Sequence, residues 1–377
     1  MKWVLICPWF INHPGAPARL HQTIWTGINK IIDSAYVAKK RERGLRKDSA
    51  LVLRALSAME NLQEYLIVWN EDSLYHPEFY KACFTPISQK WPQLSALTIK
   101  IPSQLLKSLA SIRLGNLETL EYHFCTGQMS CQDIDEMYNG VLVFVNNFKD
   151  SLGCLSFVST HTPYTLDITR IYRSLGHFPK LRSISLTVHF NAAHLADPLA
   201  FVEFLEKHRS MLEHINVLTS RCTRSDCAVQ SMPSNLENIQ KILTSIHSPF
   251  PRLRSLALAL PFRAPLTIVS DFLEMHMATL DSLILADRAL GCHELERLFK
   301  ISPFIFEGLR HLRVGLITFC THTLFYLASR MPGLTSLDIE CHSLSNSCNA
   351  QAGGGIDLVS FFLLYFGICL FLLVLPQ

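Results

Sequence analysis

The side chains best suited to chemistry in this sequence are its 12 cysteines and 16 histidines. Cys222 and Cys227 have four residues between them, as some zinc-ligand pairs do, but no second cysteine pair at ligand spacing follows. His293-Glu294 lacks the second histidine one turn later that a metalloprotease helix needs. The sequence also contains no Walker A loop, no Gly-x-Gly-x-x-Gly turn and no Gly-x-Ser-x-Gly elbow. We therefore expect no enzyme, no cofactor and no metal.

Most of the cysteines lie inside apolar runs, as Cys125, Cys154 and Cys320 do. A free thiol in such a run behaves as a small buried hydrophobe. Twelve cysteines in 377 residues do not make a disulfide scaffold, which concentrates cysteine in short secreted domains. The sequence also has no standard Asn-x-Ser/Thr glycosylation site. These features favour a reducing compartment, and we expect a cytoplasmic or nucleocytoplasmic repeat domain.

The net charge of +3 does not predict a nucleic-acid partner. Charge is concentrated in residues 38–47, AKKRERGLRK, which hold six basic residues and one acidic residue. This run fits either a nuclear-localisation patch or a solvated helix face that precedes the repeats.

An internal repeat predicts the strands and helices that would position any binding side chains. The pattern Leu-x-x-Leu-x-Leu, with other apolar residues allowed, occurs ten times, at a mean step of about 30 residues. Leucine-rich repeats usually have periods of about 20–29 residues. The three apolar positions of the ten hexads are Leu62/Tyr65/Ile67, Leu94/Leu97/Ile99, Leu117/Leu120/Tyr122, Leu152/Leu155/Phe157, Leu181/Ile184/Leu186, Leu212/Ile215/Val217, Leu253/Leu256/Leu258, Leu280/Leu283/Leu285, Leu309/Leu312/Val314 and Leu334/Leu337/Ile339.

The last two apolar positions of each hexad are two residues apart, so they face the same side of a strand. One strand cannot bury that face alone, and parallel stacking of neighbours buries a continuous core. Helices are expected between the hexads: Asp197-Pro198 has the form of a helix start, and Ser270 could cap the helix that follows it. The pattern predicts an α/β leucine-rich-repeat solenoid of about ten irregular repeats, with parallel strands on the concave face and helices on the convex face.

The residues between the apolar positions of each strand should project onto the concave face. They form two rows of small or polar side chains with few charges and no basic stripe, which favours a protein or peptide ligand over nucleic acid. The candidate binding residues, which add directional polar groups, are Glu121, His123, His214, Asn216, His311 and Arg313.

The repeat region, from about Leu51 to Ile339, resembles fungal F-box/leucine-rich-repeat proteins. The resemblance is carried by stretches such as LETLEYHF, LDITRIYRSLGHFPKLRSISL and DPLAFVEFLEKHRSMLEHINVLTSR. It implies that the repeats hold a substrate protein and that an N-terminal F-box recruits an SCF-type ubiquitin ligase. Residues 1–50 contain no Leu-Pro-x-Glu opening, so no F-box residue is assigned. The implied function is a non-enzymatic protein-interaction scaffold related to ubiquitin-ligase adaptors.

Four regions are expected along the chain: an N-terminal helical or cap region (1–50), the repeat solenoid (51–345), a linker (346–357) and a hydrophobic segment (358–375). The N-terminus, MKWVLICPWF, has the character of a short signal peptide, although Pro8 interrupts its apolar run. We favour an amphipathic lead-in to the fold.

Residues 358–375 are 18 residues without a charge. As a helix they would span about 27 Å, close to the thickness of the hydrocarbon core of a bilayer. Three interpretations stay open for this segment. It is a transmembrane tail anchor, a glycolipid-anchor signal, or else a mispredicted exon or a buried cap helix. If the segment is a tail anchor, the alternative function is that of a tail-anchored leucine-rich-repeat recognition protein on a membrane surface.

Overall fold

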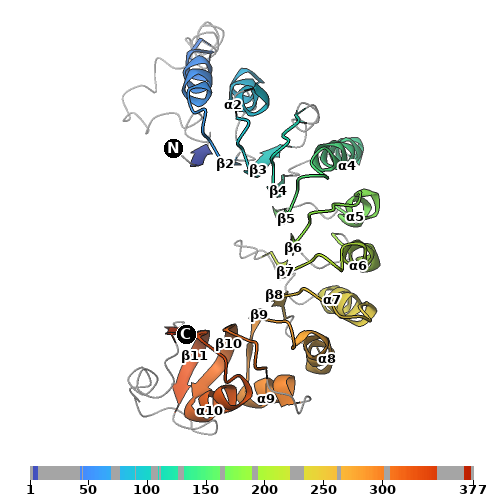
Figure 1. Cartoon of the computed structure of the whole chain (residues 1–377), viewed down its shortest axis with the longest axis vertical. Helices are drawn as coiled ribbons and strands as arrows, with labels where there is room; N and C mark the ends of the chain where they lie inside the picture. The colour runs from blue at the N-terminus through green and yellow to red at the C-terminus, as the bar shows by residue number, and fades with distance from the viewer. Residues whose placement is uncertain are drawn as a thin grey trace, which may run out of the picture. The chain divides into compact units, whose positions relative to one another are not determined.

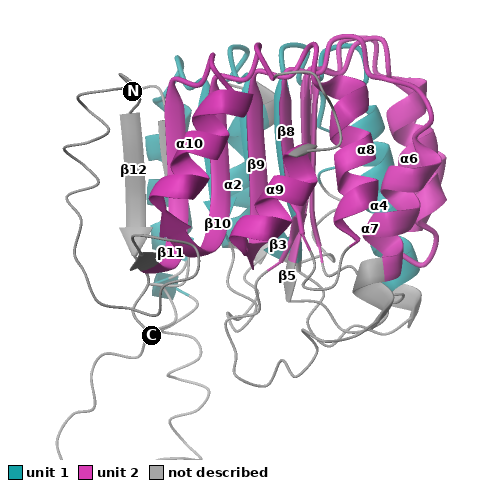
Figure 2. Ribbon diagram, turned by 90° about the horizontal axis from the view of Figure 1, so that it is seen from below, with its two compact units in different colours: residues 1–152 teal, residues 153–377 magenta. Residues whose placement is uncertain are grey.

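The alternation of strands and helices follows the repeat. The computed structural model describes residues 3–6, 43–44, 46–68, 77–89, 91–102, 109, 112–125, 131–161, 166–188, 194–220, 233–260, 265–300, 306–345 and 369–374. The chain divides into two compact units, Met1–Leu152 and Gly153–Gln377 (Figure 2).

Unit 1 builds its sheet from parallel strands in chain order. Residues 46–57 are helical and precede the first hexad. The elements of unit 1 are β1 (Trp3–Ile6), β2 (Glu64–Val68), α2 (Pro77–Gln89), β3 (Ala96–Pro102), β4 (Thr119–Cys125) and α4 (Cys131–Asn146).

Unit 2 repeats the same design, again with every described strand parallel to the next in chain order. Its strands line one side of the unit and its helices the other (Figure 1). The elements are β5 (Cys154–His161), α5 (Thr169–Ser174), β6 (Ser183–Val188), α6 (Pro198–Lys207), β7 (His214–Thr219), α7 (Pro233–Ser245), β8 (Ser255–Ala259), α8 (Leu266–His276), β9 (Ser282–Leu290), α9 (Cys292–Lys300), β10 (His311–Cys320), α10 (Thr321–Arg330), β11 (Ser336–Ser345) and β12 (Cys369–Val374).

The hexads form the core of both units. All three apolar positions of all ten hexads are buried, and the most exposed of them, Leu334, keeps only 5% of its surface. Burial of one such side chain is worth about 1.5–3 kcal/mol, so the repeated pattern is the main source of stability. The prediction of an α/β leucine-rich-repeat solenoid with parallel strands is confirmed.

A shared backbone acceptor joins neighbouring repeats within each unit. The carbonyl of Asp281, just before β9, accepts hydrogen bonds from the N–H groups of Arg310 (2.7 Å) and His311 (3.0 Å) at the start of β10. The same carbonyl position accepts two N–H groups of the following repeat at Gln63, Ser95, Gly153, Arg182, Glu213, Arg254 and Arg310. Because the bonds recur at one position of the repeat, they hold neighbouring strands in a single register.

The helix-start prediction at Asp197 is confirmed, since its carboxylate accepts the Leu199 N–H at 3.0 Å and Pro198 opens α6. The cap predicted at Ser270 is wrong. Helix α8 already begins at Leu266, and the buried Ser270 hydroxyl donates instead to the carbonyl of Leu298 at 2.6 Å. A serine inside a helix can bond a neighbouring backbone, so its type alone did not mark the helix boundary.

A buried histidine, His276, closes the turn between α8 and β9. Its Nδ1–H donates to the Phe272 carbonyl at 2.8 Å, and its Nε2 accepts the Phe250 N–H of the preceding repeat at 3.1 Å. A carbonyl can only accept and an N–H can only donate, so the ring is neutral and carries its proton on Nδ1. Burial lowers the pKa of His276.

His208 makes the same two bonds at the end of α6. Its ring lies between the Phe204 carbonyl (2.8 Å) and the Phe178 N–H (3.0 Å). Burial lowers the pKa of His208 as well, against the opposite effect of the bond to the Phe204 carbonyl, and electrostatic interactions with His177 and Lys207 add to the lowering. Two repeats therefore use a neutral histidine as a fixed link to the repeat before.

The first strand lies in the predicted N-terminal region. Residues 3–6 pair in parallel with β2, Val4 opposite Tyr65 and Ile6 opposite Ile67. Residues 7–42, which make up most of the N-terminal helical region and of the apparent signal peptide, lie outside the described residues. Of the basic run 38–47, residues 43–44 and 46–47 are helical.

The prediction of a helix over residues 358–375 needs correction at its end. Cys369–Val374 form a strand, β12, that pairs in parallel with β11, Leu370 opposite Leu337 and Leu372 opposite Ile339. An all-apolar run fits a buried strand as well as a helix, and the edge of β11 supplies backbone partners for a strand. Among the residues that are described, no helix is long and apolar enough to span a membrane. Residues 346–368, which contain the linker and the rest of the segment, lie outside the description.

Candidate functional site

The two rows of side chains predicted from the hexads lie in register. In unit 2 the first row runs Cys154, Ser183, His214, Ser255, Ser282, His311, Ser336, and the second runs Ser156, Ser185, Asn216, Ala257, Ile284, Arg313, Asp338. In unit 1 the rows are Glu64, Ala96, Thr119 and Leu66, Thr98, Glu121. These side chains alternate with the buried positions, so they project from the face of the strands opposite the core.

Glu121 and His123 of β4 form a pair on this face in unit 1. They are two residues apart on one strand, and the Glu121 carboxylate lies 2.5 Å from Nε2 of His123. The hydrogen bond to His123 lowers the pKa of Glu121, against the smaller opposite effect of burial. The side chains of Glu121 and His123 are therefore hydrogen-bonded to each other.

His214 and Asn216 lie on β7 and His311 and Arg313 on β10. His214, His311 and Arg313 are exposed, and Asn216 is half-buried between small neighbours on β6 and β8. Strands β8 and β9 separate the two pairs, which corresponds to about 14 Å at the usual spacing of neighbouring strands. The structure therefore aligns these candidates along two rows and does not gather them into one cluster.

Arg313 is held by two carboxylates of β11. Its Nε lies 3.4 Å from Oδ2 of Asp338, and its Nη2 donates to the Glu340 carboxylate. The bond to Glu340 raises the pKa of Arg313. Glu340 was missed by sequence reasoning, because it lies one position beyond the hexad, where β10 and β11 continue in register. The acidic doublet Asp338-x-Glu340 after an arginine-bearing strand was the available signal.

The strand face also contains an irregularity that the sequence did not predict. The register of β9 against β10 shifts between Val314 and Gly315, which leaves residues 286–288 as a bulge. Asp287 adopts a positive φ of 70°, and its carboxylate accepts a hydrogen bond from the Thr219 hydroxyl of β7. A Cβ on Gly315 would lie 2.9 Å from the Arg288 carbonyl oxygen, so this position requires glycine. β-Bulges are more frequent next to active sites than elsewhere in sheets, and there they change the direction of a side chain.

A column of alternating charge precedes the strands of unit 2. The residue just before each strand from β6 to β10 changes sign from one repeat to the next: Arg182, Glu213, Arg254, Asp281, Arg310. Beside this column lies an open cleft of about 590 Å³, lined by Glu213, Pro251, Arg252, Arg254, Thr279 and Asp281. Acidic and basic side chains both line the cleft, so it offers no simple anion or cation site.

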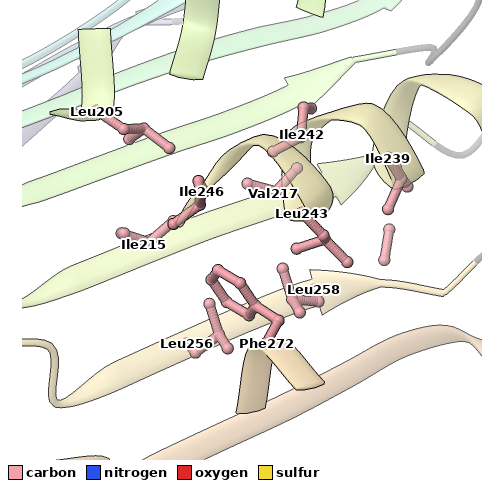
Figure 3. A pocket seen from close by; sticks show the side chains of 11 residues that line it. Leu205, Ile215, Val217, Ile239, Ile242, Leu243, Ile246, Leu256, Leu258 and Phe272 are labelled. Atoms are coloured by element: carbon pink, nitrogen blue, oxygen red, sulfur yellow. The ribbon is translucent and has the colours of Figure 1, made fainter. Parts of the chain in front are cut away.

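An enclosed apolar cavity lies between β7, α7 and β8 (Figure 3). Side chains such as Val217, Leu243 and Phe272 point into it. Its volume of about 10 Å³ is on the order of that needed by a single water. It is a gap in core packing and not a ligand pocket.

No group of three or more His, Cys, Asp or Glu side chains in the described part of the chain could hold a metal ion. Cys222 and Cys227, the pair with zinc-like spacing, lie outside that part.

No protein-family model matches the chain, and no curated protein matches it either. Among solved structures, the chain is similar to one in the Rad7–Elc1 complex of yeast. The identity is 10%, the alignment covers 91% of this chain and 98% of that one, and the TM-score is 0.43.

Proposed function

We propose that this chain is a protein-interaction scaffold that binds a partner protein on the strand face of unit 2. The observation that carries the proposal is the register of two rows of polar side chains, among them His214, Asn216, His311 and Arg313, across neighbouring strands. Such rows on a parallel sheet present a broad, regularly spaced surface, which suits a protein better than a small molecule.

The cluster around Arg313 is the part of this face best suited to anchor a partner. Arginine is among the residues whose truncation most often weakens an interface. Here its guanidinium is already oriented by Asp338 and Glu340, so less side-chain entropy is lost when a partner binds. The guanidinium of Arg313 carries five N–H donors and no acceptor, which favours a partner segment that brings carbonyl or carboxylate oxygens to it.

The test is quantitative affinity capture with the full chain and two matched variants. Arg313→Gln removes the charge on the strand face, and Arg297→Gln removes one from an exposed position of α9 on the helix side. The affinity for a protein captured by the wild type should fall about tenfold or more in Arg313→Gln, since truncating such an interface residue often costs about 2 kcal/mol of binding free energy. It should be retained with Arg297→Gln.

Equal capture by all three proteins would reject the strand face as the binding site. Circular dichroism and urea unfolding of both variants would show that any loss of binding does not come from loss of the fold. A captured protein that depends on Arg297 and not on Arg313 would move the proposal to the helix side.

The finer proposal is that the scaffold serves a ubiquitin ligase as its substrate-recognition protein. It is supported by the resemblance of the repeats to F-box/leucine-rich-repeat proteins and by a helix at residues 46–57 before the first hexad. Capture of an SCF component by the full chain is the expected result. Recovery of substrate-like partners without any SCF component would remove the ligase link and leave the scaffold proposal standing.

A further inference from the structure

Two cysteines of consecutive repeats meet where strands give way to helices in unit 2. Cys292 is the first residue of α9, and Cys320 is the N-cap of α10. Their sulfur atoms are 3.8 Å apart although the two residues are 28 positions apart in the chain. The two thiols are thus in van der Waals contact.

The hydroxyl of Thr323 links the two thiols. Its Oγ1 lies 3.2 Å from the Cys292 sulfur and 3.2 Å from the Cys320 sulfur. The Thr323 N–H also donates to the Cys320 sulfur at 3.4 Å. A hydroxyl and a backbone N–H at a helix start both stabilise negative charge on sulfur, and the thiolate is the reactive form of cysteine.

The two thiols differ in access to solvent. Cys292 is half-buried, whereas Cys320 is buried. This asymmetry is what a peroxide-sensitive pair needs: an accessible thiol that reacts first and a protected neighbour that resolves the product. A disulfide requires a sulfur–sulfur distance of about 2.05 Å, so the sulfurs must approach by about 1.8 Å from their present separation.

We propose that Cys292 and Cys320 are a dithiol site that hydrogen peroxide oxidises to a reversible disulfide between two repeats. The Cys292 thiolate attacks one peroxide oxygen, breaks the O–O bond and, with one proton, gives a sulfenic acid and one water. The Cys320 sulfur then attacks the sulfenic sulfur, gives up its proton and displaces hydroxide, which leaves as the second water. Two thiols lose two electrons and the peroxide gains them. This inference does not depend on the partner proposed for the strand face.

The test uses the full chain, reduced, freed of reductant and treated with a small excess of hydrogen peroxide at neutral pH. Remaining thiols are blocked with N-ethylmaleimide, and the protein is digested with trypsin and analysed by mass spectrometry. The expected product joins peptide 289–297, ALGCHELER, to peptide 314–330, VGLITFCTHTLFYLASR. It should disappear on treatment with dithiothreitol, and the protein should run as a monomer without reductant.

Cys83 is an internal control for selectivity. It is buried beside Tyr65, and burial raises the pKa of its thiol to about 12, so it should remain reduced. Cys320→Ser removes the resolving thiol and should increase trapping of a Cys292 sulfenic acid by dimedone several-fold. Thr323→Val should slow disulfide formation several-fold, whereas Thr323→Ser, which keeps the hydroxyl, should not.

Two results would overturn the proposal. One is oxidation of Cys292 to sulfinic or sulfonic acid in the wild type without the joined peptide. The other is a disulfide in which Cys292 pairs with a third cysteine more often than with Cys320. Both are read from the wild-type protein, so neither depends on how well a variant folds.

Discussion

Replacing His276 by phenylalanine should destabilise unit 2 although it adds no charge and leaves no large cavity. The imidazole satisfies the Phe250 N–H and the Phe272 carbonyl, and its ring stacks 5.6 Å from that of Phe250. A phenyl ring keeps the stacking and loses both hydrogen bonds. The Phe272 carbonyl keeps its bond within α8, so only the Phe250 N–H is left unpaired, at about 1–3 kcal/mol; with about 0.5–1.5 kcal/mol for the other lost bond, the free energy of unfolding should fall by about 1.5–4.5 kcal/mol.

Hydrogen exchange is the appropriate assay, because repeat proteins open locally as well as globally. The amides of β8 and β9, on either side of His276, should exchange at least about tenfold faster in the variant, which corresponds to about 1.4 kcal/mol. Urea unfolding followed by circular dichroism would measure the same loss for the cooperative unit.

His247→Phe is the matched control, since His247 is exposed and lies two residues beyond the end of α7. This variant should change the free energy of unfolding by less than about 0.5 kcal/mol. His276→Gln keeps one donor and one acceptor and should recover part of the loss. If His276→Phe were as stable as the wild type, the two hydrogen bonds would not contribute to the link between the repeats.

Three further predictions follow from the described contacts. First, folding stability should fall as the pH decreases below about 6.5, because the unfolded chain takes up protons on two histidines whose pKa is lowered in the fold; the slope should be smaller in His276→Phe. Second, Gly333→Ala should cost about 1–3 kcal/mol in urea unfolding, since its Cβ would contact the Glu307 carbonyl oxygen, while Gly115→Ala, with nothing within 4 Å, should be neutral or stabilising. Third, Asp287→Gly should be more stable than Asp287→Ala by about 1 kcal/mol. Both variants lose the hydrogen bond from Thr219, but only glycine adopts the positive φ at this position without strain. Equal thermal unfolding midpoints of the two variants would contradict this.

The strands and the core could be predicted from the sequence because one pattern specifies both. Each hexad fixes which side chains are buried, and the repetition fixes which strands are neighbours. In unit 2 the two rows lie in the register that the hexads predict, although Ala257 in the second row is buried. The binding role of His214, Asn216, His311 and Arg313 stays a prediction, since the rows place these residues without identifying what they contact.

Features that interrupt the pattern could not be predicted. The bulge at Asp287 follows an ordinary hexad, and only the close approach of Gly315 to the Arg288 carbonyl marks it. The contact between Cys292 and Cys320 depends on where two helices begin, and helix boundaries are the least certain part of any sequence pattern. The strand at residues 369–374 was mistaken for a helix because its composition is apolar on both faces.

The column of alternating charge has a consequence for how such an array can change length in evolution. Loss of one repeat, for instance the one that contributes Arg254, would bring the Glu213 and Asp281 positions onto neighbouring strands. Two like charges about 5 Å apart repel by on the order of 1 kcal/mol in water, and more where solvent is partly excluded. Loss or duplication of two repeats together would keep every neighbour opposite in sign. The array from β6 to β10 should therefore tolerate recombination in pairs of repeats better than in single repeats.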